Sequence, residues 1–139
     1  MPKTEPLIRH FMTRQPHAVE AGETVQNAGK MMTELGVRHL PVMENEKVTG
    51  IISDRDIKMV FSLIEETPNL FLVKDISYEN PYTADIETPL KSVVMEMADK
   101  SYGSAIIVQN QKLAGVFTTV DACRALTSLL KVGYKHYYF

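Results

Sequence analysis

The chain has a single cysteine, Cys123, and no tryptophan among its 139 residues. One cysteine excludes an internal disulfide and fits a reducing compartment. No stretch approaches the ~20 apolar residues that a membrane-spanning helix needs. The opening MPKTEPLIRHFM also lacks the apolar run of a secretory signal. We therefore expect a cytoplasmic protein with no membrane partner.

An excess of charge of one sign is also missing. There are 15 Lys and Arg residues against 17 Asp and Glu residues, giving a formal net charge of -2. This balance provides no electrostatic reason to expect nucleic acid or an anionic membrane as a partner. The length allows one domain, or two small repeats that share a core.

The sequence does contain an internal repeat. GIISDRD at residues 50–56 recurs as GVFTTVD at 115–121, and each stretch has glycine, two apolar residues, a hydroxyl residue, two free positions and aspartate. The offset, 115 − 50 = 65, continues without a gap outside the motif, for example in Met32/Met97 and Asn45/Asn110. Because an ungapped match of this length is improbable by chance, we infer a tandem duplication.

Apolar patterning predicts the same order of elements in both repeats: strand, helix, strand, strand, helix. The strands are expected around 17–19, 39–43 and 47–52, and again around 82–84, 104–108 and 112–117. Pro41 lies inside one of them and predicts an edge or a strand end there. The sequence thus predicts an α/β fold (α+β by some schemes) made of two β-α-β-β-α repeats. Neither repeat could bury enough surface alone, so the two should pack together.

Helical spacing predicts which side chains of the helices face the core. The first helix of each repeat should bury Val25, Ala28, Met32 and Leu35, and Leu90, Val93, Val94 and Met97. The second helix, from about Asp54 to Glu66 in the first repeat, should bury Ile57, Val60, Phe61 and Ile64, and its equivalent Ala122, Ala125, Leu126 and Leu129.

These patterns suggest boundaries along the chain. We expect the first repeat at 8–66, a linker at 67–75 where Pro68 disfavours helix, and the second repeat at 76–130. The tail at 131–139 ends in three aromatic residues. It either lacks structure or docks on a second subunit, and we favour docking.

The repeated motif has two interpretations. Ser53 and Thr118 stand where a strand ends and a helix begins, with Asp56 and Asp121 three positions later. In the structural interpretation these pairs cap the helices, each stabilising by about 1 kcal/mol. In the functional interpretation the helix N-terminus binds phosphate, the aspartate binds ribose hydroxyls, and the glycine leaves room for a flat base. From the residues alone capping comes first, and nucleotide binding stays open.

Two such repeats resemble a pair of cystathionine-β-synthase (CBS) domains, the tandem unit called a Bateman module. The resemblance covers about residues 11–130, and VRHLPVMENEKVTGIISDRDI is typical of the family. It implies a pseudo-twofold pair of repeats with two clefts between them. Such clefts commonly bind AMP, ADP or ATP, and sometimes S-adenosylmethionine or a dinucleotide such as NAD. The family often assembles as homodimers, which we expect here.

The resemblance also implies the site residues, since each cleft combines the hydroxyl and aspartate of one repeat with early-strand residues of the other. One cleft would contain Thr118 and Asp121 with His17, Ala18, Val37 and Arg38, and the other Ser53, Arg55 and Asp56 with Tyr82, Thr83, Tyr102 and Gly103. The aspartates would hold ribose, the hydroxyls and arginines would face phosphate, and backbone at 17–18 and 82–83 would meet the base. Arg55 is matched by Val120 and Arg38 by Gly103, so the clefts should differ.

The chain offers little for catalysis. Its four histidines lack metal-ligand spacing, Cys123 has no evident paired base, and there is no P-loop, nucleophile elbow or triad-like grouping. We therefore expect no enzyme and no metal, but a stand-alone regulatory module that binds an adenosyl nucleotide and signals to an effector protein. The alternative is a dimerising scaffold that binds no ligand.

Overall fold

The computed structural model describes residues 5–14, 17–63 and 71–133, which form two compact units. The first-repeat unit contains residues 17–63, 71–81 and 110–113. The second-repeat unit contains residues 5–14, 82–109 and 114–133. The tail residues 134–139, on which we predicted docking, lie outside the described residues.

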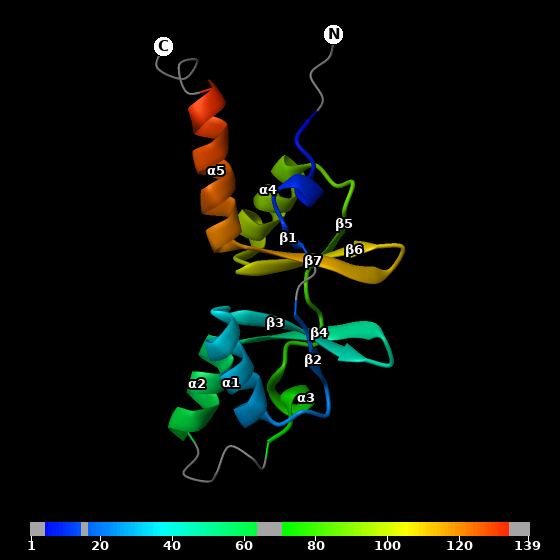
Figure 1. Ribbon diagram of the computed structural model, residues 1–139, viewed down its shortest axis with the longest axis vertical. Coiled ribbons are helices and arrows are strands. Elements are labelled where there is room, and N and C mark those ends of the chain that lie inside the picture. The colour runs from blue at the N-terminus through cyan, green and yellow to red at the C-terminus, as the bar shows by residue number, and fades with distance from the viewer. Residues whose placement is uncertain (1–4, 15–16, 64–70, 134–139) are drawn as a thin grey trace. The chain divides into compact units, whose positions relative to one another are not determined.

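The first-repeat unit is a three-stranded sheet with its helices on one face (Figure 1). The strand order is β2-β3-β4, with β2 parallel to β3 and β3 antiparallel to β4. The elements are β2 (Val19–Glu20), α1 (Val25–Leu35), β3 (His39–Glu44), β4 (Lys47–Ser53), α2 (Asp54–Leu63) and α3 (Val73–Ile76).

The second-repeat unit has a four-stranded sheet in the order β1-β7-β6-β5, also with helices on one face (Figure 1). Strand β1 is antiparallel to β7, and β5 is parallel to β6. The elements are a 3-10 helix η1 (Ile8–His10), β1 (Thr13–Arg14), β5 (Thr83–Asp85), α4 (Leu90–Lys100), β6 (Ser104–Gln109), β7 (Lys112–Thr118) and α5 (Thr119–Gly133). Both units confirm the predicted α/β fold and the β-α-β-β-α order within each repeat.

The core of each unit forms where the predicted apolar positions of the first helix meet the sheet. In the first-repeat unit the core residues are Val19, Ala21, Val25, Ala28, Met32, Leu40, Val42, Ile52, Ile57 and Val73. In the second-repeat unit they are Ile8, Ala84, Ile86, Leu90, Val93, Met97, Ala105, Ile107, Phe117 and Ala125. The periodicity of α1 and α4 therefore predicted most of their buried faces, although Val94 is exposed.

The second helix of each repeat buries less than its apolar spacing predicts. In α2 only Ile57 is fully buried and Phe61 is exposed, while Ile64 lies outside the described residues. In α5 the inward positions are Asp121 and Ala125, four residues apart, and this turns Leu126 and Leu129 toward solvent. The predictions for Phe61, Leu126 and Leu129 were wrong, because periodicity defines an apolar face without showing what covers it.

Each unit is completed by a short segment from the start of the other repeat or from the chain just before it. We call residues 6–13 and 71–78 the first and second lead segments. The 65-residue offset aligns one with the other in sequence. The first lead segment belongs to the second-repeat unit, where Ile8 N donates to Thr88 O at 2.8 Å. The second lead segment belongs to the first-repeat unit, where Val73 N donates to Glu23 O at 2.8 Å.

The lead segments make equivalent contacts in the two units. Ile8 and Val73 are both 0% exposed within the core of the unit that each joins. At the end of each segment, Thr13 pairs with Val116 and Tyr78 bridges to Ile51. The compact units therefore cross the expected repeat boundaries, and the division at 8–66, 67–75 and 76–130 remains a proposal about the sequence repeats.

The motif glycines are where the lead segments meet the sheet most closely. A Cβ atom added to Gly50 would lie 2.6 Å from Tyr78 O, and one added to Gly115 would lie 2.8 Å from Thr13 O. Only glycine allows main chain to approach this closely. The interpretation that these glycines leave room for a flat base was wrong, because the lead segments fill the space.

Pro41 lies in the middle strand of its sheet, so the prediction of an edge or strand end was wrong. The proline instead shortens the pairing of β3 with its parallel neighbour. In the second repeat, Ile106 N donates to Tyr82 O at 2.8 Å, but Pro41 stands at the equivalent position and has no N–H to donate. Consequently β2 begins at Val19, one residue later in the repeat than β5 at Thr83.

Candidate functional site

The candidate site begins at the corner between β4 and α2. Ser53 N donates to Asp56 Oδ2 at 3.3 Å, and Asp56 N donates to Ser53 Oγ at 3.1 Å. This reciprocal pair is a capping box with aspartate in place of the usual glutamate. The structural interpretation of the motif is therefore present at this corner. Asp56 is half-buried.

The corner between β7 and α5 repeats this geometry. Thr118 N donates to Asp121 Oδ2 at 2.9 Å, and Asp121 N donates to Thr118 Oγ1 at 3.4 Å. Two hydroxyls also bond the carboxylate: Thr118 Oγ1 to Oδ2 at 3.2 Å, and Thr13 Oγ1 to Oδ1 at 3.3 Å. Asp121 is 8% exposed and is the one charged side chain classed as buried among the described residues.

The main chain at the start of each helix is also bonded within its unit. Asp54 N donates to Arg38 O at 2.8 Å, and Thr119 N donates to Gly103 O at 3.2 Å. A phosphate could not use these N–H groups without displacing the carbonyl groups. The anion-binding capacity of the corners therefore depends more on side chains than the sequence interpretation assumed.

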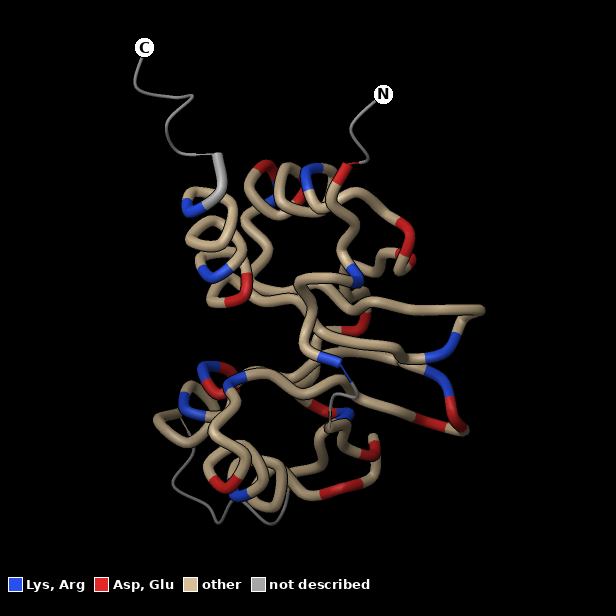
Figure 2. The backbone as a smooth tube through the Cα atoms, turned by 45° about the horizontal axis from the view of Figure 1, so that its top comes forward, with Lys and Arg blue, Asp and Glu red and all other residues tan. Residues whose placement is uncertain are grey.

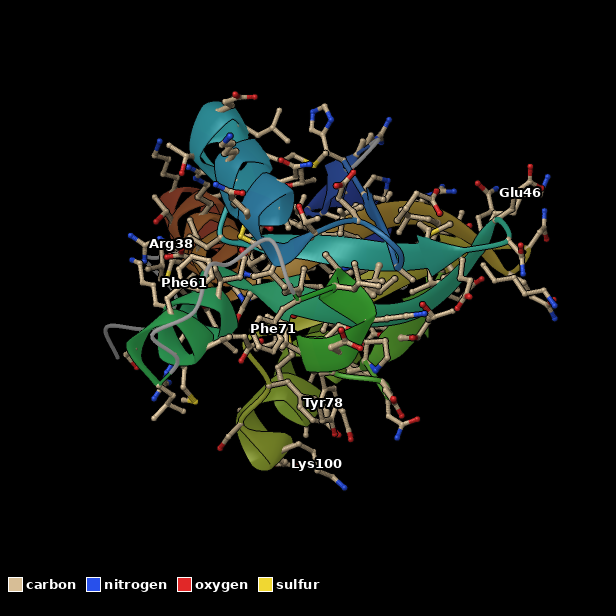
Figure 3. All side chains as sticks on the ribbon, turned by 90° about the horizontal axis from the view of Figure 1, so that it is seen from below. Arg38, Glu46, Phe61, Phe71, Tyr78 and Lys100 are labelled. Carbon is tan, nitrogen blue, oxygen red and sulfur yellow. The ribbon has the colours of Figure 1, made fainter. Side chains whose placement is uncertain are left out.

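The structure brings some predicted site residues together within each unit. Val37 and Arg38 lie between α1 and β3, beside the Ser53 corner. Figure 3 shows Arg38 far from Glu46, which lies in the turn at the other end of the β3–β4 hairpin. Residues 17–18 precede β2, and Arg55 is exposed on the first turn of α2. In the second-repeat unit, Gly103 lies beside the Thr118 corner. The combinations of residues across repeats that the resemblance implies remain a proposal.

Two further predicted residues form an aromatic pair in the second-repeat unit. The rings of Tyr82 and Tyr102 are stacked, with centroids 5.4 Å apart and planes inclined by 24°. Burial, followed by the charge of Glu96 and the neighbouring Tyr102, raises the pKa of Tyr82 above 10.0. Tyr82 precedes Thr83, the first residue of β5. The equivalent positions of the first repeat hold His17 and Val37, so only one repeat presents this aromatic surface.

His39, the first residue of β3, pairs with Ser53 and lies near the charged groups of that corner. Burial lowers the pKa of His39 below its ordinary value of 6.5. The negative charge of Asp56 opposes this shift, the positive charge of Arg38 adds to it, and Asp54 opposes it more weakly. Burial dominates, so His39 favours its neutral form in the folded protein.

Sequence reasoning missed Thr13, which contacts Asp121 from a position 108 residues away in the chain. The repeated motif gave no sign of it, because the contact depends on the first lead segment joining the second-repeat unit. The equivalent of Thr13 in the second lead segment is Tyr78, so the repeat offset does not suggest a shared polar role either.

Among the described residues, charges of both signs are distributed over each unit (Figure 2). Figure 2 shows acidic and basic residues interspersed along the helices and hairpins of each unit. Across residues 5–14, 17–63 and 71–133, no group of three or more His, Cys, Asp or Glu residues could hold a metal ion. Within the same residues, no helix combines the length and the apolar character that crossing a bilayer requires.

Curated relatives match over most of the chain. A homoserine O-acetyltransferase of Methanococcus vannielii is 22% identical over 126 residues, covering 89% of this chain and 25% of the relative. An inosine-5′-monophosphate dehydrogenase of Korarchaeum cryptofilum is 29% identical over 122 residues, covering 87% of this chain and 24% of the relative. The chain thus spans about a quarter of the length of these two enzymes.

Solved structures match the fold over nearly their whole length. An uncharacterized conserved protein of Pyrococcus horikoshii is 27% identical, with a TM-score of 0.79 over 90% of this chain and 95% of that chain. The CBS domain pair of protein MJ0100, in complex with 5′-methylthioadenosine and S-adenosyl-L-methionine, has a TM-score of 0.81 at 20% identity and covers 90% and 98%. CBSX2 of Arabidopsis thaliana, in complex with AMP, has a TM-score of 0.74 at 22% identity and covers 89% and 98%.

The CBS domain profile matches the chain twice, over residues 8–62 and 73–128. These matches fall on the two repeats that the 65-residue offset defines, and together they cover most of the sequence. The expected resemblance is confirmed by the profile and by the fold of the solved structures. The chain belongs to the CBS domain family and carries two CBS repeats.

Proposed function

We propose that this chain is a regulatory module that binds an adenosyl nucleotide through its two strand-to-helix corners and signals the bound state to an effector protein. Two proteins with the same fold support the ligand class: the MJ0100 pair, in complex with 5′-methylthioadenosine and S-adenosyl-L-methionine, and CBSX2, in complex with AMP. All three ligands contain an adenosine ribose. AMP, ADP and ATP are our first candidates, followed by S-adenosylmethionine and NAD.

The observation that carries this proposal is how little of each carboxylate the capping boxes use. Ser53 N and Thr118 N both bond an Oδ2 atom, at 3.3 and 2.9 Å. A carboxylate can accept about four hydrogen bonds in all. Asp56 can therefore cap its helix and still accept bonds from ribose hydroxyls, whereas Asp121, which the hydroxyls of Thr118 and Thr13 also bond, has less capacity left. The structural and functional interpretations of the motif are compatible.

The other residues take the roles that the resemblance implies. Ser53, Thr118, Arg38 and Arg55 would bond the phosphates, because hydroxyl and guanidinium groups make strong bonds to anions. Backbone at His17, Ala18, Tyr82 and Thr83 would contact the base edge, and Val37, Tyr102 and Gly103 would be further residues of the clefts. No chemical step is assigned to any of them, and we propose a binding role without catalysis.

Isothermal titration of the full chain against AMP, ADP, ATP, S-adenosylmethionine and NAD tests the proposal. We expect at least one compound to bind, and Asp56→Asn to weaken that binding at least tenfold, which is the effect of losing a bond of about 1.4 kcal/mol or more to a charged group. Asp75→Asn is a matched control, because Asp75 Oδ2 accepts from Leu72 N at 3.0 Å in a similar cap but lies in no predicted site. It should cost stability without changing affinity.

If no compound binds, the ligand proposal fails and the scaffold alternative remains. That alternative has its own support in exposed apolar side chains on α2 and α5, among them Met59, Leu63 and Leu126. Such side chains favour contact with another protein surface. We propose a homodimer in either case. Light scattering on the same samples measures the particle mass, and the mass of a monomer would rule out the dimerising scaffold.

A further inference from the structure

Asp121 is more fully occupied than its counterpart Asp56. Its Oδ2 atom accepts from Thr118 N at 2.9 Å and from Thr118 Oγ1 at 3.2 Å. Thr13 Oγ1 lies 3.3 Å from Oδ1 and 3.5 Å from Oδ2, so it covers both oxygen atoms. With 8% of the residue exposed, little carboxylate surface is open to an incoming group.

Thr13 is fixed in this position by the main chain around it. It is the first residue of β1 and pairs with Val116 of β7. The lead segment that carries it is anchored by Ile8, which is 0% exposed in the core of the same unit. Gly115 beside it has no side chain that could push the segment away. The main chain therefore places Thr13, itself an exposed residue, beside Asp121, where its hydroxyl bonds the carboxylate.

The equivalent position near Asp56 contributes nothing comparable. Tyr78 bonds Ile51 through main-chain atoms in both directions, at 2.9 and 3.0 Å. Tyr78 is 57% exposed. Figure 3 shows it far from Arg38, which lies at the Ser53 corner because its carbonyl accepts from Asp54 N. Among the described residues, the Asp56 carboxylate accepts one hydrogen bond, from Ser53 N, and none from a hydroxyl.

We propose that Thr13 restricts ligand access to Asp121, so that the two aspartates bind a ribose unequally and Asp56 is occupied first. This inference rests on the proposed function, because it assumes that ribose hydroxyls bond both carboxylates. Two adjacent hydroxyls need an acceptor site on each oxygen. At Asp56 these sites are available, whereas at Asp121 the ligand must displace the Thr13 hydroxyl. A part-exposed bond to a charged group corresponds to about a fivefold loss of affinity.

The test compares AMP with 2′,3′-dideoxy-AMP by isothermal titration. The full chain carries Asp56→Asn throughout, so that binding at Asp121 is isolated. Adding Thr13→Ala should strengthen AMP binding about fivefold, because Oδ1 becomes available. Thr13→Ser keeps the hydroxyl and should restore the weaker binding. With 2′,3′-dideoxy-AMP, which has no ribose hydroxyls to use the freed oxygen, Thr13→Ala should give no gain.

Each outcome has one meaning. Unchanged or weaker AMP binding by Thr13→Ala, or an equal gain with the dideoxy compound, overturns the role of Thr13 while leaving the proposed function intact. If the chain without substitutions binds no adenosyl compound, the proposed function fails and this inference fails with it. Circular dichroism checks folding, and if Thr13→Ala does not fold, Thr13→Val removes the hydroxyl at nearly constant volume and must show the same ribose-dependent gain.

Discussion

Replacing Ile8 by alanine should destabilise the second-repeat unit, although Ile8 lies at the start of the first repeat. Ile8 is 0% exposed and packs in the core that contains Leu90, Val93 and Phe117. Truncating a fully buried isoleucine to alanine costs about 2–5 kcal/mol, since apolar contacts are lost and a cavity remains. We expect the upper half of this range, because the lead segment also anchors main-chain bonds at Thr88 and Leu90.

Two measurements check this prediction. Urea unfolding followed by circular dichroism gives the change in the free energy of unfolding, and native-state hydrogen exchange shows where protection is lost. Ile8→Ala should reduce protection in α4 and β6 first. Val73→Ala is the matched control and should reduce protection in α1 and β3, because Val73 is 0% exposed in the first-repeat core.

A structural role of Ile8 in the second-repeat core is contradicted if Ile8→Ala exposes α1 and β3 before α4 and β6. The same role is contradicted if the free energy of unfolding changes by less than about 1 kcal/mol, since such a value does not fit the loss of a fully buried side chain. Ile8→Val should cost only about 0.5–1.5 kcal/mol and provides a graded comparison.

Gly50→Ala should lower the free energy of unfolding by about 1–3 kcal/mol through overpacking, because its Cβ would lie 2.6 Å from Tyr78 O. Gly22→Ala, which would meet nothing within 4 Å, should change it by no more than about 0.5 kcal/mol, and equal urea midpoints for the two variants would contradict this. Burial lowers the pKa of His39 from 6.5, so the unfolded chain takes up the proton first as the pH falls. Stability should therefore decrease from about pH 6.5 down to the folded-state pKa and then level off. His39→Gln should flatten this part of the stability–pH curve, and an unchanged slope would assign it to another group.

Much of the fold could be predicted because the duplication shows it twice. The 65-residue offset aligned the motifs, and the apolar spacing of α1 identified Val25, Ala28 and Met32 as core residues. The capping interpretation also anticipated the bonds between Ser53 and Asp56, since these depend only on residues three positions apart. Features set by local sequence were therefore accessible.

What could not be predicted depends on contacts between distant segments. Nothing in the sequence around Ile8 shows that it joins a core built mainly from residues 84–125. The role of Gly50 was misjudged for the same reason, since its close neighbour is the main chain of Tyr78. The exposure of Leu126 followed from Asp121 taking the inward side of α5, and a buried carboxylate runs against the apolar pattern.

The lead segments also determine which fragments of this chain contain a complete core. A fragment ending at residue 63 would contain the first sheet but lack Val73, and a fragment starting at residue 71 would lack Ile8. A protein with a single repeat would also lack the lead segment that completes its core, unless another molecule supplied it. Residues 17–81, by contrast, include every core side chain of their sheet. A fragment chosen to retain this core would therefore begin partway into one repeat and end just inside the next.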